Sequence, residues 1–348
     1  MTNSFLSDLA QPHQIDNYLT LKVNPYGKIS LDILKQYCIS AVFKFFKNPI
    51  YVESPLIQGN LTDSTEIIGI SKGASLRHTF HHFYFKNLKN KIVDEDSFPL
   101  TYLESGLLFR GESTGKLQSF TRQTAFNVTD VHSFSLNKEQ AMNNIRSVIS
   151  CIRSFEKDWD VKFNVKCHIR DNSIIDWKDI QSIWGEDFEV NRNSNEEALL
   201  ALDFDIKLSN NKIVELSALE IYSVKIGGRE SILVDFTLGG TERILSSIIE
   251  INGTLPFWLS PIQIIALAQN INQKEIPYTE ELRIMIVDKE SQIEKYRKKY
   301  WIPEIYNGEL NWVDYSLNMQ KTIPDILKIP PYKPFFPKKL GGCCNDLF

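Results

Sequence analysis

The sequence lacks any uninterrupted apolar run close to the roughly 20 residues that a membrane-spanning helix needs. Its first residues, MTNSFLSDLAQPHQ, also lack the basic start and apolar stretch of a secretory signal. The 348-residue chain has no basic excess, because 39 Lys and Arg against 43 Asp and Glu give a net charge of −4. This balance argues against a protein whose main task is to coat nucleic acid. We expect a cytoplasmic protein with no membrane partner.

Cysteine is also scarce. The 5 cysteines are scattered and odd in number, which is not the pattern of a disulfide framework in a chain without a secretory signal. With 43% hydrophobic and 24% charged residues, the chain can nevertheless bury a substantial core.

The sequence contains none of the usual glycine-rich phosphate loops. Neither the Gly-x-x-x-x-Gly-Lys-Ser pattern nor a Gly-x-Gly-x-x-Gly fingerprint opening a helix is present. The His-Glu-x-x-His and paired Cys-x-x-Cys metal motifs are missing as well. A nucleotide site in this chain would therefore have to bind phosphates through side chains rather than through backbone amides.

The hydrophobic pattern predicts helices and an antiparallel sheet. Apolar residues three or four apart indicate helices over 31–46 and about 136–155, the second capped by Ser135, and another helix begins near Thr241. Strands are predicted over the following ranges: 50–52, 100–110, 119–127, 198–208, 213–226 and 231–238. Short polar or glycine turns separate the last three and imply hairpins. The fold class predicted is α+β, an antiparallel sheet flanked by helices.

This pattern divides the chain into three parts. Residues 1–28 are expected to be an irregular N-terminal segment, and residues 29–270 the main folded domain. Residues 271–348 carry a charged helical stretch and a proline-rich tail, which predict a wrapped or mobile extension rather than a folded domain.

One hairpin offers side chains that suit a nucleotide. Alternation places Arg110 and Glu112 on one face of its first strand, and Arg122 and Phe126 on one face of its second. Two guanidinium groups, a carboxylate and an aromatic ring could clamp a phosphate chain and stack on a base. The same pattern also fits a surface hairpin with solvated charges and a core phenylalanine.

The hairpin belongs to a larger resemblance. Residues 106–115 read GLLFRGESTG and are followed by Arg122, Phe126, Asp130 and His132. This segment resembles motif 2 of class II aminoacyl-tRNA synthetases, and the threonyl-tRNA synthetase version is the nearest. Residues 238–243, LGGTER, resemble motif 3. Pro55 lies where motif 1 would, and residues 255–263, LPFWLSPIQ, resemble the segment that leads to an anticodon-binding domain.

The resemblance implies that residues 29–270 form a class II synthetase-like catalytic domain, which activates an amino acid with ATP. Arg110 would hold the α-phosphate and the substrate carboxylate, Arg122 would reach the phosphates, and Glu112 would bind the adenine amino group. Phe126 and Arg243 would cover the two faces of the adenine. Glu215 or Glu220 would hold Mg²⁺, although a solvated strand carboxylate explains Glu215 equally well.

The resemblance also implies a zinc site, which this sequence does not preserve. Threonyl-tRNA synthetases use one cysteine and two histidines, and the corresponding positions here are Ser75, His132 and Val234. Serine and valine do not supply the sulfur and nitrogen donors of such a site. We therefore expect no zinc, with Asp130, His132 and His78 left to bind the amino acid. The apolar Leu216, Ala218 and Leu219 then predict an amino acid less polar than threonine.

Two questions remain open at this level. The activated amino acid could pass to tRNA or to the thiol of a carrier protein. The residues after Gln263 show no recognisable α/β pattern of an anticodon-binding domain, which favours the carrier. Alternatively, the chain could be a catalytically inactive synthetase paralogue that senses amino acids or tRNA, which the joint presence of the three motif arginines argues against. Class II cores pair through the motif 1 helix and strand, so the resemblance implies a homodimer.

Overall fold

A computed structural model of the chain describes residues 4–59, 67–71, 73–89, 93–111, 117–118, 120–192, 197–267, 283–287, 289, 291, 304–306, 311–314 and 319–322. The chain forms two compact units. The larger contains residues 12–21 and 35–244, and the smaller contains residues 4–11, 22–34 and the described part of the chain from 245 onward. Helices α2 (Pro25–Phe45) and α6 (Thr241–Asn252) contribute residues to both units.

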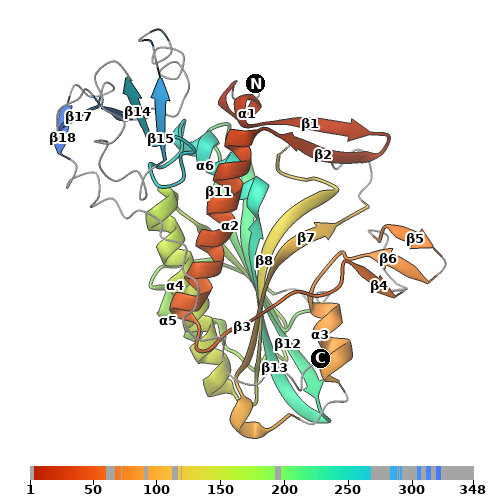
Figure 1. Ribbon diagram of the computed structural model, residues 1–348. Coiled ribbons are helices and arrows are strands. Elements are labelled where there is room, and N and C mark those ends of the chain that lie inside the picture. The colour runs from red at the N-terminus through yellow and green to blue at the C-terminus, as the bar shows by residue number, and fades with distance from the viewer. Residues whose placement is uncertain are drawn as a thin grey trace. The chain divides into compact units, whose positions relative to one another are not determined.

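An eight-stranded sheet forms the centre of the larger unit (Figure 1). Its strands, in spatial order, are β10 (Glu189–Arg192), β9 (Asn164–Ile169), β11 (Leu200–Lys207), β12 (Ile213–Ile226), β13 (Arg229–Gly240), β8 (Ala125–Ser135), β7 (Leu100–Phe109) and β3 (Ile50–Val52). The five inner pairs are antiparallel, and the two edge pairs, β10–β9 and β3–β7, are parallel. The α+β fold with an antiparallel sheet predicted from the sequence is confirmed.

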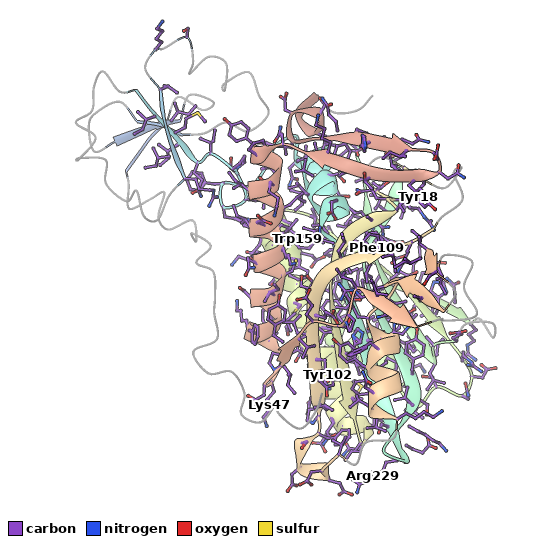
Figure 2. The ribbon with its side chains drawn as sticks, turned by 45° about the vertical axis from the view of Figure 1, so that its right-hand side comes forward. Tyr18, Lys47, Tyr102, Phe109, Trp159 and Arg229 are labelled. Carbon is purple, nitrogen blue, oxygen red and sulfur yellow. The ribbon has the colours of Figure 1, made fainter. Side chains whose placement is uncertain are left out.

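Helices cover both faces of this sheet. Helices α4 (Lys138–Trp159) and α5 (Trp177–Trp184) lie on one face (Figure 1). Helix α4 is capped by Asn137, whose side chain accepts a hydrogen bond from the Gln140 amide, and not by the expected Ser135. Near the end of α4, the buried Trp159 ring stacks on Phe155 at 4.4 Å (Figure 2).

The opposite face carries helix α3 (His81–Leu88). Its Tyr84 ring stacks at 5.0 Å on Tyr102 of β7, and both belong to a buried cluster with Phe134 and Leu233. The short 3₁₀ helix Glu95–Ser97 precedes β7. Helix α3 thus fills one part of this face.

The first residues of the chain are regular, in contrast to the irregular segment expected over 1–28. They form α1 (Ser4–Leu9) and a hairpin of β1 (Ala10–Ile15) and β2 (Tyr18–Val23). Within the larger unit, the Leu19 amide donates to Thr124 Oγ1 at 2.9 Å, and the Thr124 amide donates to the Leu19 carbonyl at 2.8 Å. The hairpin therefore gains order from a contact more than 100 residues away in sequence, which local patterning does not reveal.

A small sheet lies at the outside of the larger unit. It consists of β4 (Ile57–Gly59), β6 (Ala74–Leu76) and β5 (Gly69–Ser71), in that spatial order. The side chains of Ile57 and Ile70 are 59% and 51% exposed.

The smaller unit contains a second sheet, whose strands include short described segments of the expected 271–348 extension. Its order is β15 (Ile284–Val287), β14 (Ile264–Leu267), β16 (Glu304–Tyr306), β17 (Asn311–Asp314) and β18 (Met319–Thr322). Strand β14 is parallel to both of its neighbours, and the last three strands are antiparallel. Arg283 joins this sheet to the preceding loop by donating to the carbonyls of Trp258 and Ser260 at 2.7 and 2.8 Å. The expected proline-rich tail lies outside the described residues.

None of the helices that the structure describes is long and apolar enough to cross a membrane.

Candidate functional site

A cavity of about 240 Å³ opens on the face of the large sheet that α3 only partly covers. It lies within the larger unit, over strands β7, β8, β12 and β13, and reaches the first residues of α6. Its polar lining residues include Thr79, His81, Arg110, Thr121, Arg122, Gln123, Asp130, Glu215, Glu220, Asp235, Thr237, Glu242 and Arg243.

Strand register explains why residues so distant in sequence meet here. His132 of β8 lies opposite Asp235 of β13, which in turn lies opposite Glu220 of β12. Two residues further along the strands, Asp130 lies opposite Thr237. Because side chains alternate between faces, both rows point to the same side of the sheet. The antiparallel register therefore builds a polar floor for the cavity.

Three arginines line one end of the cavity. Arg243, near the start of α6, donates from Nε to the Thr121 carbonyl at 2.7 Å and from Nη1 to the Glu215 carbonyl at 3.0 Å. The guanidinium carbon of Arg110 lies 5.4 Å from the centre of the Phe126 ring. Arg122 lies in the same cavity wall. The cavity thus has a cationic end with an aromatic ring, and backbone carbonyls hold one of its guanidinium groups in place.

Two consecutive glycines bring the end of β13 close to this ring. Gly239 has φ of +94°, and a Cβ atom there would lie 1.7 Å from the Leu216 carbonyl oxygen. A Cβ at Gly240 would lie 3.6 Å from Phe126. The β13–β8 register shifts by one residue between Thr237 and Gly240, which marks a bulge. The bulge and the glycines direct the chain into α6 next to Phe126.

A buried carboxylate fastens α6 to the sheet. Glu242 accepts hydrogen bonds from the Asn127 amide at 3.1 Å and from Asn127 Nδ2 at 2.9 Å. Burial raises the pKa of Glu242, and the hydrogen bonds from Asn127 act in the opposite direction. This link positions Arg243, the next residue, over the cavity.

The other end of the cavity is acidic. Burial raises the pKa of Asp130 to about 7, against the lowering effect of Arg110. Burial, with the neighbouring carboxylates of Asp130 and Glu220, raises the pKa of Asp235 well above its ordinary value. Burial lowers the pKa of His132 to about 3, so the imidazole is neutral. A cavity lined by both arginines and carboxylates suits a ligand that carries charges of both signs.

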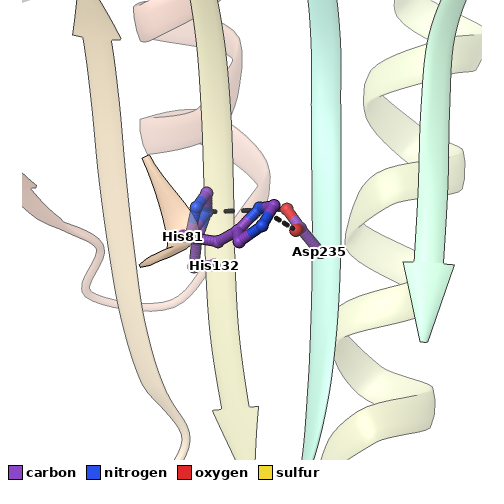
Figure 3. A group of neighbouring side chains, drawn as sticks. All are labelled: His81, His132 and Asp235. Atoms are coloured by element: carbon purple, nitrogen blue, oxygen red, sulfur yellow. Dashed lines mark ion pairs between the residues drawn. The ribbon is translucent and has the colours of Figure 1, made fainter. Parts of the chain in front are cut away.

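The structure brings most of the predicted site residues together. The following line the one cavity: Arg110, Arg122, Phe126, Asp130, Glu215, Glu220 and Arg243. His132 is buried beside Asp235, with Nδ1 at 3.5 Å from its Oδ1 (Figure 3), and is not itself a lining residue of the cavity. His78 is buried and does not line the cavity, whereas His81, the first residue of α3, does. Glu112 lies outside the described residues. The individual roles of these residues remain predictions.

The expected apolar wall is only partly present. Leu216 and Ala218 line the cavity, but Leu219 is fully buried elsewhere, because its side chain alternates to the other face of β12. Asp130, Glu220 and Asp235 make this region more polar than the sequence suggested.

The three positions that correspond to the zinc ligands, Ser75, His132 and Val234, do not line the cavity. Ser75 is buried in β6 and does not line the cavity. Val234 is buried, and alternation turns it away from the face that Asp235 shares with the cavity. The sequence comparison pointed to Val234 and missed its neighbour Asp235, which lines the cavity. Asp235 could have been found from alternation with Thr237.

Structural comparison defines the fold as that of class II aminoacyl-tRNA synthetases. Over 94% of this chain, the structure is similar to 96% of the chain described as the RNA binding domain of threonyl-tRNA synthetase from Cryptosporidium parvum, with a TM-score of 0.74 and 18% identity. Over 93% of this chain, it is similar to 74% of Giardia lamblia prolyl-tRNA synthetase in complex with prolyl-adenylate, with a TM-score of 0.68 and 14% identity.

In sequence, the chain is similar to threonyl-tRNA synthetases, as its motifs predicted. It is 26% identical to the Mycoplasmopsis pulmonis protein over 212 residues, which cover 51% of this chain and 36% of that protein. It is 24% identical to the Acetivibrio thermocellus protein over 255 residues, which cover 66% of this chain and 40% of that protein. The chain therefore matches less than half the length of these curated relatives. No family model matches the chain.

Proposed function

We propose that this chain activates an amino acid with ATP, forming an aminoacyl-adenylate, and transfers the amino acid to an acceptor. The observation that carries the proposal is that Arg110, Arg122, Arg243 and Phe126 share one cavity over the antiparallel sheet. A second support is that the similar Giardia prolyl-tRNA synthetase holds prolyl-adenylate.

The chemistry explains why such a cavity suits the reaction. The carboxylate of the amino acid attacks the α-phosphorus of ATP, and pyrophosphate leaves. Both reactants are anions, so the site must supply positive charge and hold them in line. Arg110 would contact the α-phosphate and the substrate carboxylate, because its guanidinium lies over the Phe126 ring in the same cavity as Asp130. The acidic end, with Asp130 and Glu220, would receive the α-ammonium group of the amino acid.

The nucleotide would occupy the cationic end. Adenine would stack on Phe126, and Arg243 would cover its other face. Arg122 would contact the phosphates, and Glu112 would bind the adenine amino group. Carboxylate oxygens are the ligands that Mg²⁺ prefers, and Glu215, exposed at the cavity rim, or Glu220 would supply one. Magnesium would neutralise the charge of the leaving pyrophosphate.

We infer that tRNA is the acceptor. The carrier-protein alternative rested on the net charge of −4 and on the lack of a recognisable anticodon-binding pattern, and the mixed sheet of β14–β18 weakens the second reason. The similar Cryptosporidium chain, of which this chain covers 96%, is described as an RNA binding domain.

Amino-acid-dependent exchange of pyrophosphate into ATP tests the activation step. The full chain, supplied with ATP, Mg²⁺ and labelled pyrophosphate, is assayed with each of the twenty amino acids. We expect exchange with one or a few. Exchange with threonine alone would show that the expectation of a less polar substrate is wrong. Absence of exchange with all twenty, together with retained ATP binding, would favour the inactive, sensing paralogue instead.

A second assay tests the acceptor. The chain is incubated with ATP and the labelled amino acid found by exchange, and then receives either total tRNA or a phosphopantetheinylated carrier protein. We expect label to become acid-precipitable with tRNA. Label on the carrier alone would contradict the tRNA assignment and leave the activation step intact.

A further inference from the structure

The turn of the N-terminal hairpin contributes little to the hydrophobic core. Residues 11–18 are all exposed, and the large side chains beside the turn, Ile15 and Tyr18, are 58% and 46% exposed. Leu19, the next residue of β2, is only 7% exposed. Core packing therefore does not explain this part of the hairpin, and its role depends on what Leu19 contacts.

Leu19 pairs with Thr124, which directly precedes strand β8. Both residues belong to the larger unit. The Leu19 amide donates to Thr124 Oγ1 at 2.9 Å, and the Thr124 amide donates to the Leu19 carbonyl at 2.8 Å. The Thr124 carbonyl in turn accepts from the Arg110 amide at 2.8 Å. Thr124 is 4% exposed, so it links the hairpin to the backbone of Arg110 at a place shielded from water.

This part of the chain lies beyond the β7–β8 ladder. The last pair of that ladder is Phe109 and Ala125, so Arg110 and residues 121–124 follow its end. The Phe109 amide donates away from β8, to the Arg77 carbonyl at 2.9 Å. Buried backbone groups past the end of a ladder need partners from other segments. Strand β2 supplies such partners through Leu19.

The segment 121–124 bears on all three arginines of the cavity. Arg122 belongs to it, and the Thr124 carbonyl holds the backbone of Arg110. Arg243 Nε donates to the Thr121 carbonyl at 2.7 Å. A shift of this segment would therefore move the guanidinium groups relative to one another. A reaction between two anions depends on such groups being aligned to within about 1 Å.

We propose that Thr124 is a positioning residue for ATP, and that the N-terminal hairpin acts on the site through it. The inference rests on the proposed function, because it assigns the cavity to ATP. Thr124 does not line the cavity, so it acts on the nucleotide through Arg110 and Arg122. Its hydroxyl oxygen is the acceptor that fixes the Leu19 amide. Valine has nearly the same shape but no acceptor, and would leave that buried amide unpaired.

Calorimetric titration of the full chain with ATP and Mg²⁺, without amino acid, tests the proposal. We expect Thr124→Val to weaken ATP binding about 10-fold, as the weakening of one hydrogen bond to a charged group does. Pyrophosphate exchange at saturating ATP should fall about 100-fold, because a displacement of about 1 Å has an effect of that order. Thr124→Ser restores the hydroxyl and should recover both. Equal losses in Thr124→Ser and Thr124→Val would overturn the role of the hydroxyl.

Thr101→Val is the matched control. Thr101 Oγ1 lies 2.7 Å from Ser133 Oγ in a buried pair of β7 and β8, and neither residue lines the cavity. The same substitution thus removes a buried hydroxyl contact away from the arginines, and ATP affinity should be unchanged. A merely structural role of Thr124 would lower the thermal midpoint in both variants and leave ATP affinity of the folded chains equal. That result would overturn the proposal.

Leu19→Pro tests the same link from the hairpin. Proline removes the amide donor, and the exposed neighbours of Leu19 make loss of the whole fold unnecessary, so this variant decides if Thr124→Val does not fold. Wild-type ATP affinity in Leu19→Pro, with exchange intact, would overturn the positioning role and leave the proposed function standing. Weaker ATP binding in this variant, in a chain whose wild type binds ATP without exchange, would support the positioning role and contradict activation. A wild-type chain that binds no ATP would overturn both.

Discussion

At the scale of single residues, Arg110 bears the largest share of the proposed chemistry. Its guanidinium lies against the Phe126 ring, in the same cavity as Asp130. An arginine can contact a phosphate and a carboxylate through separate N–H groups, whereas lysine offers only a point charge. The planar group, and not the charge alone, should therefore set the rate of activation.

Replacing Arg110 should slow activation with little change in stability. We expect Arg110→Ala to lower pyrophosphate exchange by about 10²–10³-fold, as the loss of one electrostatic contact to a transition state does, and Arg110→Lys to recover only part of it. Arg229→Ala is the control, because Arg229 is the first residue of β13 (Figure 2), does not line the cavity, and pairs with Glu95 at 2.9 Å. Equal exchange by Arg110→Ala and wild type would contradict the role.

Gly239 is a second residue whose identity the structure explains. Its positive φ strains any other residue, and in addition its missing Cβ makes room for the Leu216 carbonyl. Gly228 separates these two effects: its φ is +81°, but a Cβ there would have nothing within 4 Å.

We expect Gly239→Ala to destabilise the fold by about 3 kcal/mol or more, because backbone atoms must move. Gly228→Ala should cost only about 1 kcal/mol, the conformational penalty alone. Thermal midpoints of the two variants, compared with the wild type, measure the difference. Similar midpoints in both variants would mean that the close approach to Leu216 has no energetic consequence.

At the scale of elements, a buried ion pair joins four segments around β7. Glu104 accepts from the Ser54 amide at 2.7 Å and from Arg77 Nη1 at 2.7 Å, and it also accepts from the Tyr84 hydroxyl. Arg77 donates further to the Leu107 carbonyl at 2.9 Å. Both charged side chains are at most 1% exposed. The pair thus ties the segment after β3, the end of β6 and helix α3 to the large sheet.

Neutralising one member of this pair should destabilise the larger unit strongly. Glu104→Gln keeps the shape but leaves the Arg77 guanidinium buried without its counter-charge, which costs about 3–5 kcal/mol. Glu230→Gln removes a partner of Lys225 from a pair in which both side chains are about two-thirds exposed, and should cost less than about 1 kcal/mol. Thermal unfolding compares them. Equal losses in the two variants would contradict the structural role of the network.

Elements were predictable from the sequence where local periodicity determines them. The strand over 213–226 has the predicted bounds, and α6 begins at the predicted Thr241. The strand expected over 119–127 instead spans Ala125–Ser135, because its partner in β7, and not a local pattern, sets where pairing begins. Segments β9, α5 and β10 were not predicted. Contacts distant in sequence also determine the N-terminal hairpin.

Some residues of the candidate site were also predictable from the sequence, and others were not. The arginines and Phe126 were predictable because a motif carries them within a few residues of one another. Asp235 was not, because the sequence comparison pointed to its neighbour Val234, which alternation on β13 turns away from the cavity. His81 was not, because its approach to His132 depends on how α3 packs on the sheet. Residues that meet only through register and packing leave no local signal.

At the scale of the whole molecule, exposed apolar side chains at and after strand β3 form a surface where two chains could pair. Strand β3 is an edge of the large sheet, and its Tyr51 side chain is 46% exposed. Leu56 and Ile57, which follow it, are 46% and 59% exposed. An open strand edge next to exposed apolar side chains is a surface that a second chain can cover. This region includes Pro55, where the resemblance placed motif 1, so it suits the predicted homodimer.

Charge placed on this surface should separate the two copies. We expect the wild-type chain to have twice the mass of one chain by light scattering, and Ile57→Glu to shift it toward the monomer. Ile213→Glu is the matched control, since Ile213 is 56% exposed at the start of β12 and should leave the mass unchanged. A charge buried in an apolar interface costs several kcal/mol, whereas the same charge on a free surface costs little. A wild-type monomer, or a dimer that Ile57→Glu leaves intact, would show that this surface does not pair.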